Sequence, residues 1–214
     1  MQTQQLKQLL LQSLEHERAG VEVYETAIRC AVSEDLKHQW SEYLEQTHTH
    51  VALLEGVLRK LEIDPEHASP GRRIVRSLGN ALVMAMETAK ASGGDRLAAQ
   101  LVACECIVLA ETKDHMNWEL LTKCAERLGG AQKQALEEAC ELVEEQEDEH
   151  LYHSRGYCRE LWLDSLGLPA MLPPPEDEGM DARGRATRGA VAGMQHVRSA
   201  ISAAQAQQQS ERNR

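Results

Sequence analysis

The chain has 214 residues and a formal net charge of −11, from 23 Lys and Arg against 34 Asp and Glu. This balance argues against a nucleic-acid partner, because phosphate contacts need a basic face. The length suits one good-sized core with an appendage. No apolar run follows a basic start, and no apolar stretch is long enough to span a bilayer. We therefore expect no signal peptide, no membrane partner and a cytoplasmic location.

Cysteine usage agrees with that expectation. The six cysteines are scattered through helix-forming stretches and form no C-x-x-C pair. Such a distribution is typical of reduced thiols in a cytosolic protein. We expect most of them to be buried and to serve core packing.

The pattern of residues 3–31 predicts one amphipathic helix. Its apolar face includes Leu10, Leu14 and Val21 at helical spacing, but Glu17 interrupts that face. An aromatic residue, Tyr24, follows on the same side seven residues after Glu17. A glutamate at the edge of the face that reaches water is one explanation, and an inward-facing functional carboxylate is the other.

A second helix is predicted over residues 34–61, capped by Ser33. Its apolar face contains a histidine, His50, with Thr47 one turn earlier. The more obvious motif, Glu45-x-x-His48, lies on a polar stripe. The helical phase therefore favours His50 as the inward imidazole. Only a local wide turn of the helix would rotate Glu45 and His48 inward instead.

Turn-forming residues at 63–71 precede a further helix over residues 72–91. Its position in the chain suits a long connection that crosses from one end of a bundle to the other. Because this helix is mostly apolar, it could also cover the bundle or form a contact in a homodimer.

The third principal helix is predicted over residues 95–128. One apolar face contains Glu111, His115 and Trp118, so a glutamate is again followed by an aromatic residue seven positions later. Asp114 lies one turn from Glu111 and could either stand in for a ligand or face water. Glu105, on a neighbouring stripe, is a less favoured candidate.

The fourth principal helix is predicted over residues 131–166. It carries Glu147 and His150 on its apolar face, three residues apart and therefore one turn from each other. A buried carboxylate costs several kcal/mol unless a cation or hydrogen bonds compensate it. Four helices that each direct a carboxylate or an imidazole inward need a common explanation. A shared metal site is the simplest one, because cations compensate several buried carboxylates at once.

This arrangement resembles the ferritin-like superfamily of carboxylate-bridged di-metal bundles, over about residues 5–165. The family motif places a Glu on helices one and three and a Glu-x-x-His on helices two and four. The resemblance implies an all-α, ferritin-like four-helix bundle with an extra crossover helix between helices two and three. The stretches 44–51 and 125–129 are also similar to the YciE/YciF-type stress proteins of that superfamily.

The metal ligands that the resemblance implies are Glu17, His50, Glu111, Glu147 and His150. They would hold two iron ions, with manganese as the alternative, and each ion would have one histidine. The sequence departs from the motif at Thr47, where a carboxylate is expected. This departure predicts a weakly held second ion or a site for one ion only.

Two functions follow from the resemblance. The first is a ferroxidase or another di-iron oxidoreductase that acts on ferrous iron, on dioxygen or peroxide, or on a small-molecule substrate. The second is a non-catalytic stress or scaffold protein with a degenerate or single-metal site. Simple metal binding or sensing is a third reading of the same residues.

The organisation of the chain changes near residue 168. We assign residues 1–168 to the bundle and residues 169–214 to a Pro-rich linker followed by an Ala/Gln-rich tail. A thin apolar stripe at Ala190, Met194, Val197 and Ile201 could form a short helix. The last ten residues suit a flexible tail equally well.

Overall fold

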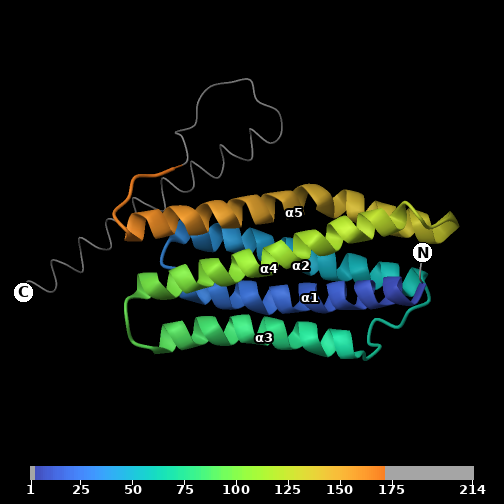
Figure 1. Cartoon of the computed structure of the whole chain (residues 1–214), viewed down its shortest axis with the longest axis horizontal. Helices are drawn as coiled ribbons and strands as arrows, with labels where there is room; N and C mark the ends of the chain where they lie inside the picture. The colour runs from blue at the N-terminus through green and yellow to red at the C-terminus, as the bar shows by residue number, and fades with distance from the viewer. Residues whose placement is uncertain (1–2, 172–214) are drawn as a thin grey trace, which may run out of the picture.

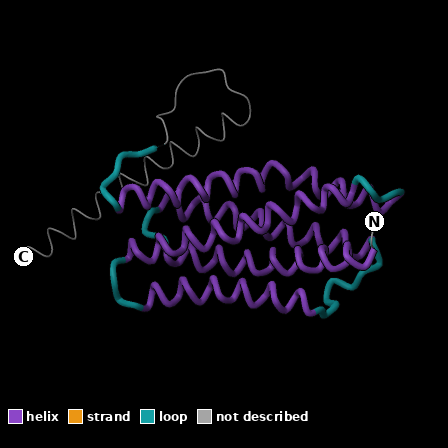
Figure 2. Tube along the Cα trace, in the orientation of Figure 1, coloured by secondary structure: helices purple, strands orange, loops and turns teal. Residues whose placement is uncertain are grey.

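The computed structural model describes residues 3–171, and within that range it contains five α-helices and no strand (Figures 1 and 2). The helices are α1 (Thr3–Cys30), α2 (Glu34–Lys60), α3 (Pro70–Ala91), α4 (Arg96–Ala125) and α5 (Gly130–Ser165). The all-α class predicted from the sequence is confirmed, and each helix begins and ends within three residues of its predicted limits. None of the described helices has both the length and the apolar character needed to cross a membrane.

Local sequence signals set the ends of several helices. The Ser33 hydroxyl accepts a hydrogen bond from the Leu36 amide at the start of α2, and Asp95 does the same for the Leu97 amide at the start of α4. Helix α3 starts with Pro70, directly after the capping Ser69. Helix α5 is followed by Gly167, whose φ of 67° is a left-handed conformation that favours glycine.

The helices lie along one another in an elongated bundle (Figure 1). Helix α1 packs against α2, α3 and α4, while α5 packs against α4 and α2. Helix α3 carries the chain back along the outside of α1 and α4, so α2 and α4 run in the same direction and α1 and α5 run opposite to them (Figure 1). The chain segment between α2 and α4 therefore returns from one end of the bundle to the other.

The hydrophobic core consists of two clusters separated by a polar layer. One cluster includes Val23, Trp40 and Ile107, and the other includes Leu14 and Leu54. Each of α1, α2, α4 and α5 contributes to both clusters and crosses from one to the other near its middle. The polar residues described below lie at these crossing points, where the carboxylates and imidazoles are shielded from solvent on both sides.

Helix α3 is attached to α1 by a buried ion pair and by a close helix contact. The guanidinium of Arg72 donates two hydrogen bonds to Glu15, at 2.6 and 2.9 Å, and Arg76 donates one at 2.5 Å. Gly79 lies against Ala19, and a Cβ at position 79 would come within 2.5 Å of the Ala19 Cβ. The two helices can approach this closely because position 79 has no side chain.

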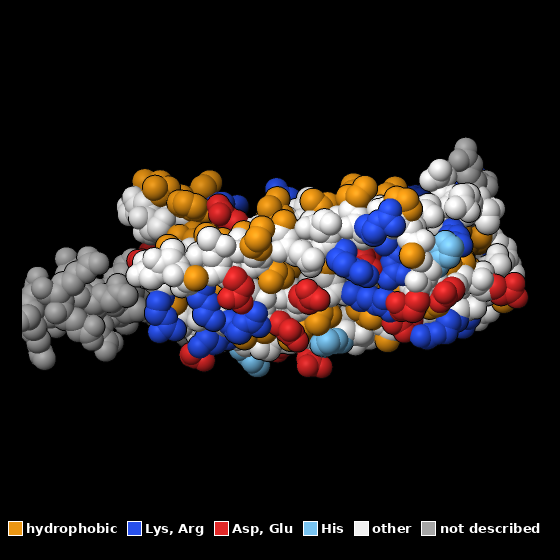
Figure 3. Space-filling view, turned by 90° about the horizontal axis from the view of Figure 1, so that it is seen from below, with side chains coloured by type: hydrophobic (Ala, Val, Ile, Leu, Met, Phe, Trp, Pro, Cys, Tyr) orange, Lys and Arg blue, Asp and Glu red, His pale blue; other side chains and the backbone are white. Residues whose placement is uncertain are grey.

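The outer face of α3 is partly apolar. Ile74, Leu78 and Met84 are each more than 60% exposed, and apolar side chains lie among groups of Lys, Arg, Asp and Glu on this side of the molecule (Figure 3). Helix α3 thus covers part of the bundle, as the sequence suggested, and still exposes apolar side chains. A homodimer contact through this face stays a prediction.

Two further expectations concern cysteines and the tail. All six cysteines are free thiols, of which Cys30, Cys104, Cys106 and Cys140 are buried, in agreement with the packing role predicted for most of them. The predicted linker and tail fall mainly on residues 172–214. They lie outside the described residues.

Candidate metal centre

Two glutamates, Glu17 on α1 and Glu111 on α4, are each held by an aromatic side chain of the other helix. The indole Nε1 of Trp118 donates a hydrogen bond to Glu17 Oε1 at 2.7 Å. In the reverse direction, the Tyr24 hydroxyl donates to Glu111 Oε1 at 2.7 Å. Each helix therefore supplies the aromatic partner of the glutamate on the other helix. This exchange explains why both helices place an aromatic residue seven positions after the glutamate.

Two histidines, His50 on α2 and His150 on α5, are each held by a glutamine of the other helix. His50 Nε2 lies 2.8 Å from Gln146 Oε1, and His150 Nε2 lies 2.5 Å from Gln46 Oε1. An amide oxygen only accepts hydrogen bonds, so it favours a proton on Nε2 of each ring. The other ring nitrogen, Nδ1, then faces the carboxylates in the middle of the bundle.

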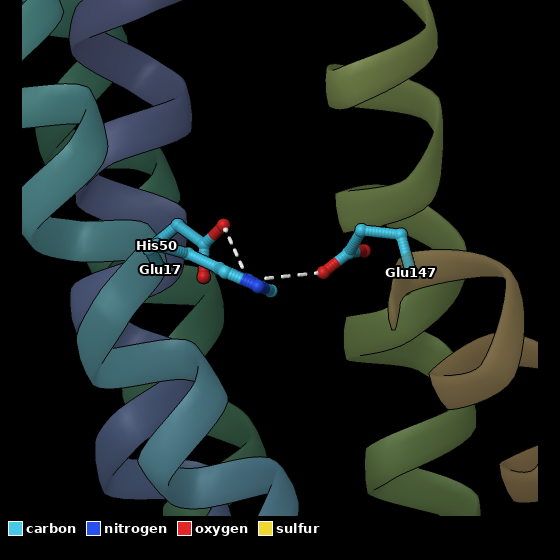
Figure 4. A group of neighbouring side chains, drawn as sticks. All are labelled: Glu17, His50 and Glu147. Carbon is cyan, nitrogen blue, oxygen red and sulfur yellow. Dashed lines mark ion pairs between the residues drawn. The ribbon is translucent and has the colours of Figure 1, made fainter. Parts of the chain in front are cut away.

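Glu147 on α5 lies between the two imidazoles. His50 Nδ1 is 3.2 Å from Glu147 Oε1 and 3.4 Å from Glu17 Oε1. Figure 4 shows Glu17 and His50 together on neighbouring helices, with Glu147 directed toward them from α5. His150 Nδ1 is 3.7 Å from Glu147 Oε1 and 3.4 Å from Glu111 Oε2. These five residues form two groups, Glu17–His50–Glu147 and Glu111–Glu147–His150, in each of which the candidate ligand atoms lie within 4.8 Å of one another.

Several of these atoms have no hydrogen-bond partner among the described residues. They are Glu17 Oε2, Glu111 Oε2, His50 Nδ1 and both carboxylate oxygens of Glu147. All five side chains are at most 5% exposed. Buried polar groups in folded proteins are nearly always paired, and a buried carboxylate without a partner is costly. A cation between these atoms would remove that cost, so the residues present suit a bound metal ion.

The electrostatics of the metal-free site favour a proton on His50. Burial opposes the charged imidazolium, but the carboxylates of Glu147 and Glu17 outweigh burial and raise the pKa of His50 to about 10. Burial raises the pKa of Glu147 to about 7 against the opposing effect of His50, and the carboxylates of Glu111 and Glu17 raise it further. The proton on His50 therefore occupies the position that suits a cation.

A fourth acidic residue, Asp114, is buried beside this site. It is 6% exposed, so the alternative that it faces water is wrong. Burial and the nearby carboxylates of Glu17, Glu147 and Glu111 raise the pKa of Asp114 well above its ordinary value. Asp114 is not part of either three-residue group.

His48 and His50 of α2 differ as the helical phase predicted. His50 is fully buried, whereas Glu45 and His48 are exposed, so no wide turn rotates the Glu45-x-x-His48 motif inward. Thr47 is buried, and its hydroxyl donates to the Tyr43 carbonyl at 2.8 Å. The position one turn before His50 therefore supplies no carboxylate.

One expectation on α4 needs correction. His115 was assigned to the apolar face, but its side chain is 22% exposed and its Nε2 lies 2.8 Å from Asp148 on the outside of the bundle. The straight helix instead directs Asp114, one residue earlier, inward between Glu111 and Trp118. Glu105 is exposed and accepts a hydrogen bond from Trp162.

Sequence reasoning missed the roles of Gln46 and Gln146. A signal was present, because each glutamine precedes a histidine of the apolar face by four residues, on α2 and on α5 alike. The contacts of Tyr43 were not predicted either. The Tyr43 ring lies 4.1 Å from the His150 ring, centroid to centroid, and its hydroxyl is 2.5 Å from His153 Nδ1.

Comparison with known protein families, with curated proteins and with solved structures finds no match. The reading of this site therefore depends on its own geometry and chemistry. The structure establishes that buried Glu and His groups lie close enough to hold a metal ion.

Proposed function

We propose that the chain is a ferritin-like metal-binding protein whose carboxylate and histidine side chains hold two iron or manganese ions. One observation carries this proposal. Five buried ligand-type side chains from four helices converge, and inward atoms of Glu17, His50, Glu111 and Glu147 have no hydrogen-bond partner among the described residues. Carboxylate and imidazole ligands together suit iron or manganese, whereas thiolates would favour zinc or iron–sulfur sites.

The division of ligands follows from the two groups. Glu17 and His50 would hold one ion, Glu111 and His150 would hold the other, and Glu147 would be shared between them. The glutamines keep a proton on Nε2 of each imidazole and so leave Nδ1 for the metal. Trp118 and Tyr24 fix the orientation of Glu17 and Glu111. On binding of a cation, His50 would release the proton from Nδ1.

A bound redox-active ion would supply one-electron chemistry and an open coordination position for dioxygen or peroxide. The side chains around the site keep it dry, because the two apolar clusters cover it along the bundle axis. We propose oxidation of ferrous iron, or activation of dioxygen or peroxide, as the activity.

Thr47 favours a second candidate function. It leaves the Glu17–His50 side without a carboxylate of its own on α2, so Glu147 has to serve both sides. The alternative is therefore a non-catalytic stress or scaffold protein with a single-metal or degenerate site.

The test is loading with ferrous iron in the absence of oxygen, followed by exposure to air. We expect the metal-free chain to bind ferrous iron. After air is admitted, the ligand-to-metal charge-transfer absorption of ferric iron should rise. Asp148→Asn removes an exposed carboxylate next to Glu147 and serves as the control, since it should leave binding unchanged.

Three results separate the candidates. Iron binding followed by oxidation supports the redox function. Binding of iron or manganese without turnover of ferrous iron or peroxide supports the binding or scaffold function. Absence of any binding of either metal, together with equal thermal stability of the wild type in the presence and absence of metal, would overturn the metal-centre proposal.

A further inference from the structure

We propose that Asp114 is the fourth carboxylate of the centre and determines whether the bundle holds one divalent cation or two. This inference rests on the proposed function, because it assumes that the five ligand residues bind metal. It goes further by assigning a role to a residue outside both three-residue groups, and it predicts the stoichiometry of the site.

The first argument is the position of Asp114. It follows Glu111 by one turn on α4, is 6% exposed, and its Oδ1 has no hydrogen-bond partner among the described residues. On the inward side of α4 it lies between Glu111 and Trp118, and Trp118 donates a hydrogen bond to Glu17. Because its oxygens do not lie within 4.8 Å of a full ligand set, Asp114 acts beside the ligands as a source of charge.

The second argument is charge balance. Two divalent cations carry four positive charges, whereas Glu17, Glu111 and Glu147 carry three negative charges and the two imidazoles are neutral when they bind metal. The remaining positive charge would be buried between two apolar clusters, which is unfavourable. An ionised Asp114 supplies the missing negative charge. A single cation needs no such contribution.

The third argument comes from the matched helix pairs. The same difference in residue number relates Glu17 to Glu111, Tyr24 to Trp118 and Gly20 to Asp114. The spacing that matches His50 to His150 likewise matches Thr47 to Glu147. A Cβ on Gly20 would lie 3.4 Å from the Thr47 methyl group, so these two small residues adjoin each other. The α1–α2 pair thus lacks two carboxylates that the α4–α5 pair supplies.

The experiment measures manganese(II) binding to the metal-free 214-residue chain at fixed pH. Titration calorimetry gives the affinity, and metal analysis after desalting gives the stoichiometry. We expect two ions for the wild type and one ion for Asp114→Asn, with the second ion weakened about 100-fold because a buried charge lacks compensation. Glu105→Gln removes one exposed carboxylate from the same helix and should keep two ions.

Asp114→Glu separates charge from shape, because it keeps the negative charge and should keep two ions. Circular dichroism and thermal unfolding of the metal-free variants check their folding. If Asp114→Asn does not fold, the smaller Asp114→Ser takes its place.

Two ions of unchanged affinity in Asp114→Asn would overturn the inference and indicate that a hydroxide from water supplies the charge. A wild type that binds only one ion would also overturn it, while the single-metal form of the proposed function would survive. A wild type that binds no metal would overturn the proposed function itself.

Discussion

The α1–α2 and α4–α5 pairs of helices carry the same polar groups in the same order, with one exception in the ligand set. Each pair supplies a glutamate, an aromatic partner for the opposite glutamate, a glutamine and a histidine. Where α5 has Glu147, however, α2 has Thr47. The supporting hydrogen bonds are therefore the same in the two pairs of helices, whereas the number of carboxylate ligands differs. The two sides of the centre should therefore bind cations unequally.

Removal of Glu147 should have the largest effect on this comparison. Because Glu147 belongs to both three-residue groups, Glu147→Gln should weaken binding on both sides, with a loss of affinity on the order of 1,000-fold. Calorimetric titration with manganese(II) measures the loss. The exposed Asp148→Asn is the control. If Glu147→Gln bound manganese(II) as tightly as the wild type does, the two sides of the centre would not share this carboxylate.

The pH dependence of binding should distinguish the two sides. The pKa of His50 is raised to about 10, so a metal ion on the Glu17 side has to displace its proton at neutral pH. Affinity on that side should rise about tenfold per pH unit between pH 7 and 9, because one proton is released per ion. Titrations at several pH values measure the slope, and a flat profile would contradict the prediction.

The same shift has a consequence for the metal-free protein. Since the folded pKa of His50 lies above its ordinary value of 6.5, the stabilisation that comes from protonation of His50 is fully present below pH 6.5. That contribution is lost as the pH rises through about 10. Chemical unfolding of metal-free wild type should therefore show declining stability over this range, and His50→Gln should remove the decline.

A buried ion pair between Glu15 and Arg72 ties the α1–α2 pair to α3. Glu15→Gln would leave Arg72 buried without its charged partner and should lower the free energy of unfolding at pH 7 by about 3 kcal/mol. Burial opposes the charge on Glu15, but hydrogen bonds from Arg76 and Arg72 lower its pKa below 4.5. The stabilisation is present above pH 4.5 and is lost as the pH falls through the lowered pKa.

Urea unfolding at pH 7 and at pH 3 measures this effect. The difference between wild type and Glu15→Gln should shrink at the lower pH, where the wild-type carboxyl is increasingly protonated. Glu25→Gln, which changes an exposed glutamate of the same helix, should have little effect at either pH. If the free energies of unfolding of wild type and Glu15→Gln differed by the same amount at both pH values, the ion pair would not be the cause of the difference.

The glutamine exchange predicts a smaller and separable effect. Gln146→Ala should weaken the ion held by His50, and Gln46→Ala should weaken the ion held by His150, each by about 10- to 100-fold. Manganese(II) titrations of the two variants test whether each change affects only one binding step. Gln134→Ala changes an exposed glutamine of α5 and is a suitable control. A loss in the same step for both variants would contradict the crossed pairing.

Helical periodicity was sufficient to predict most of the fold. The spacing of Leu10, Leu14 and Glu17, and of Glu147 and His150, determines which side of a long straight helix faces inward. The same phase argument distinguished His50 from His48. It was less decisive on α4, which is apolar on several sides, and there it selected His115 although Asp114 points inward.

Partners across the bundle could not be predicted in the same way. The bonds of Gln46 to His150 and of Trp118 to Glu17 depend on the relative heights of two helices, which a pattern along one helix does not contain. The contact of Arg72 with Glu15 depends in addition on where α3 lies. These are long-range arrangements, so they follow from packing and not from spacing.

The polar layer between the two apolar clusters also fixes how the helices align lengthwise. A slip of α2 by one turn, about 5.4 Å, would move its groups out of reach of α5. Both glutamine–histidine bonds would break at once, and a slip in one of the two directions would put Leu54 in the place of His50 beside Glu17 and Glu147. Leucine and alanine side chains alone would tolerate such a slip far better. The polar layer therefore favours one lengthwise alignment of the helices over the others, whether or not a metal ion is bound.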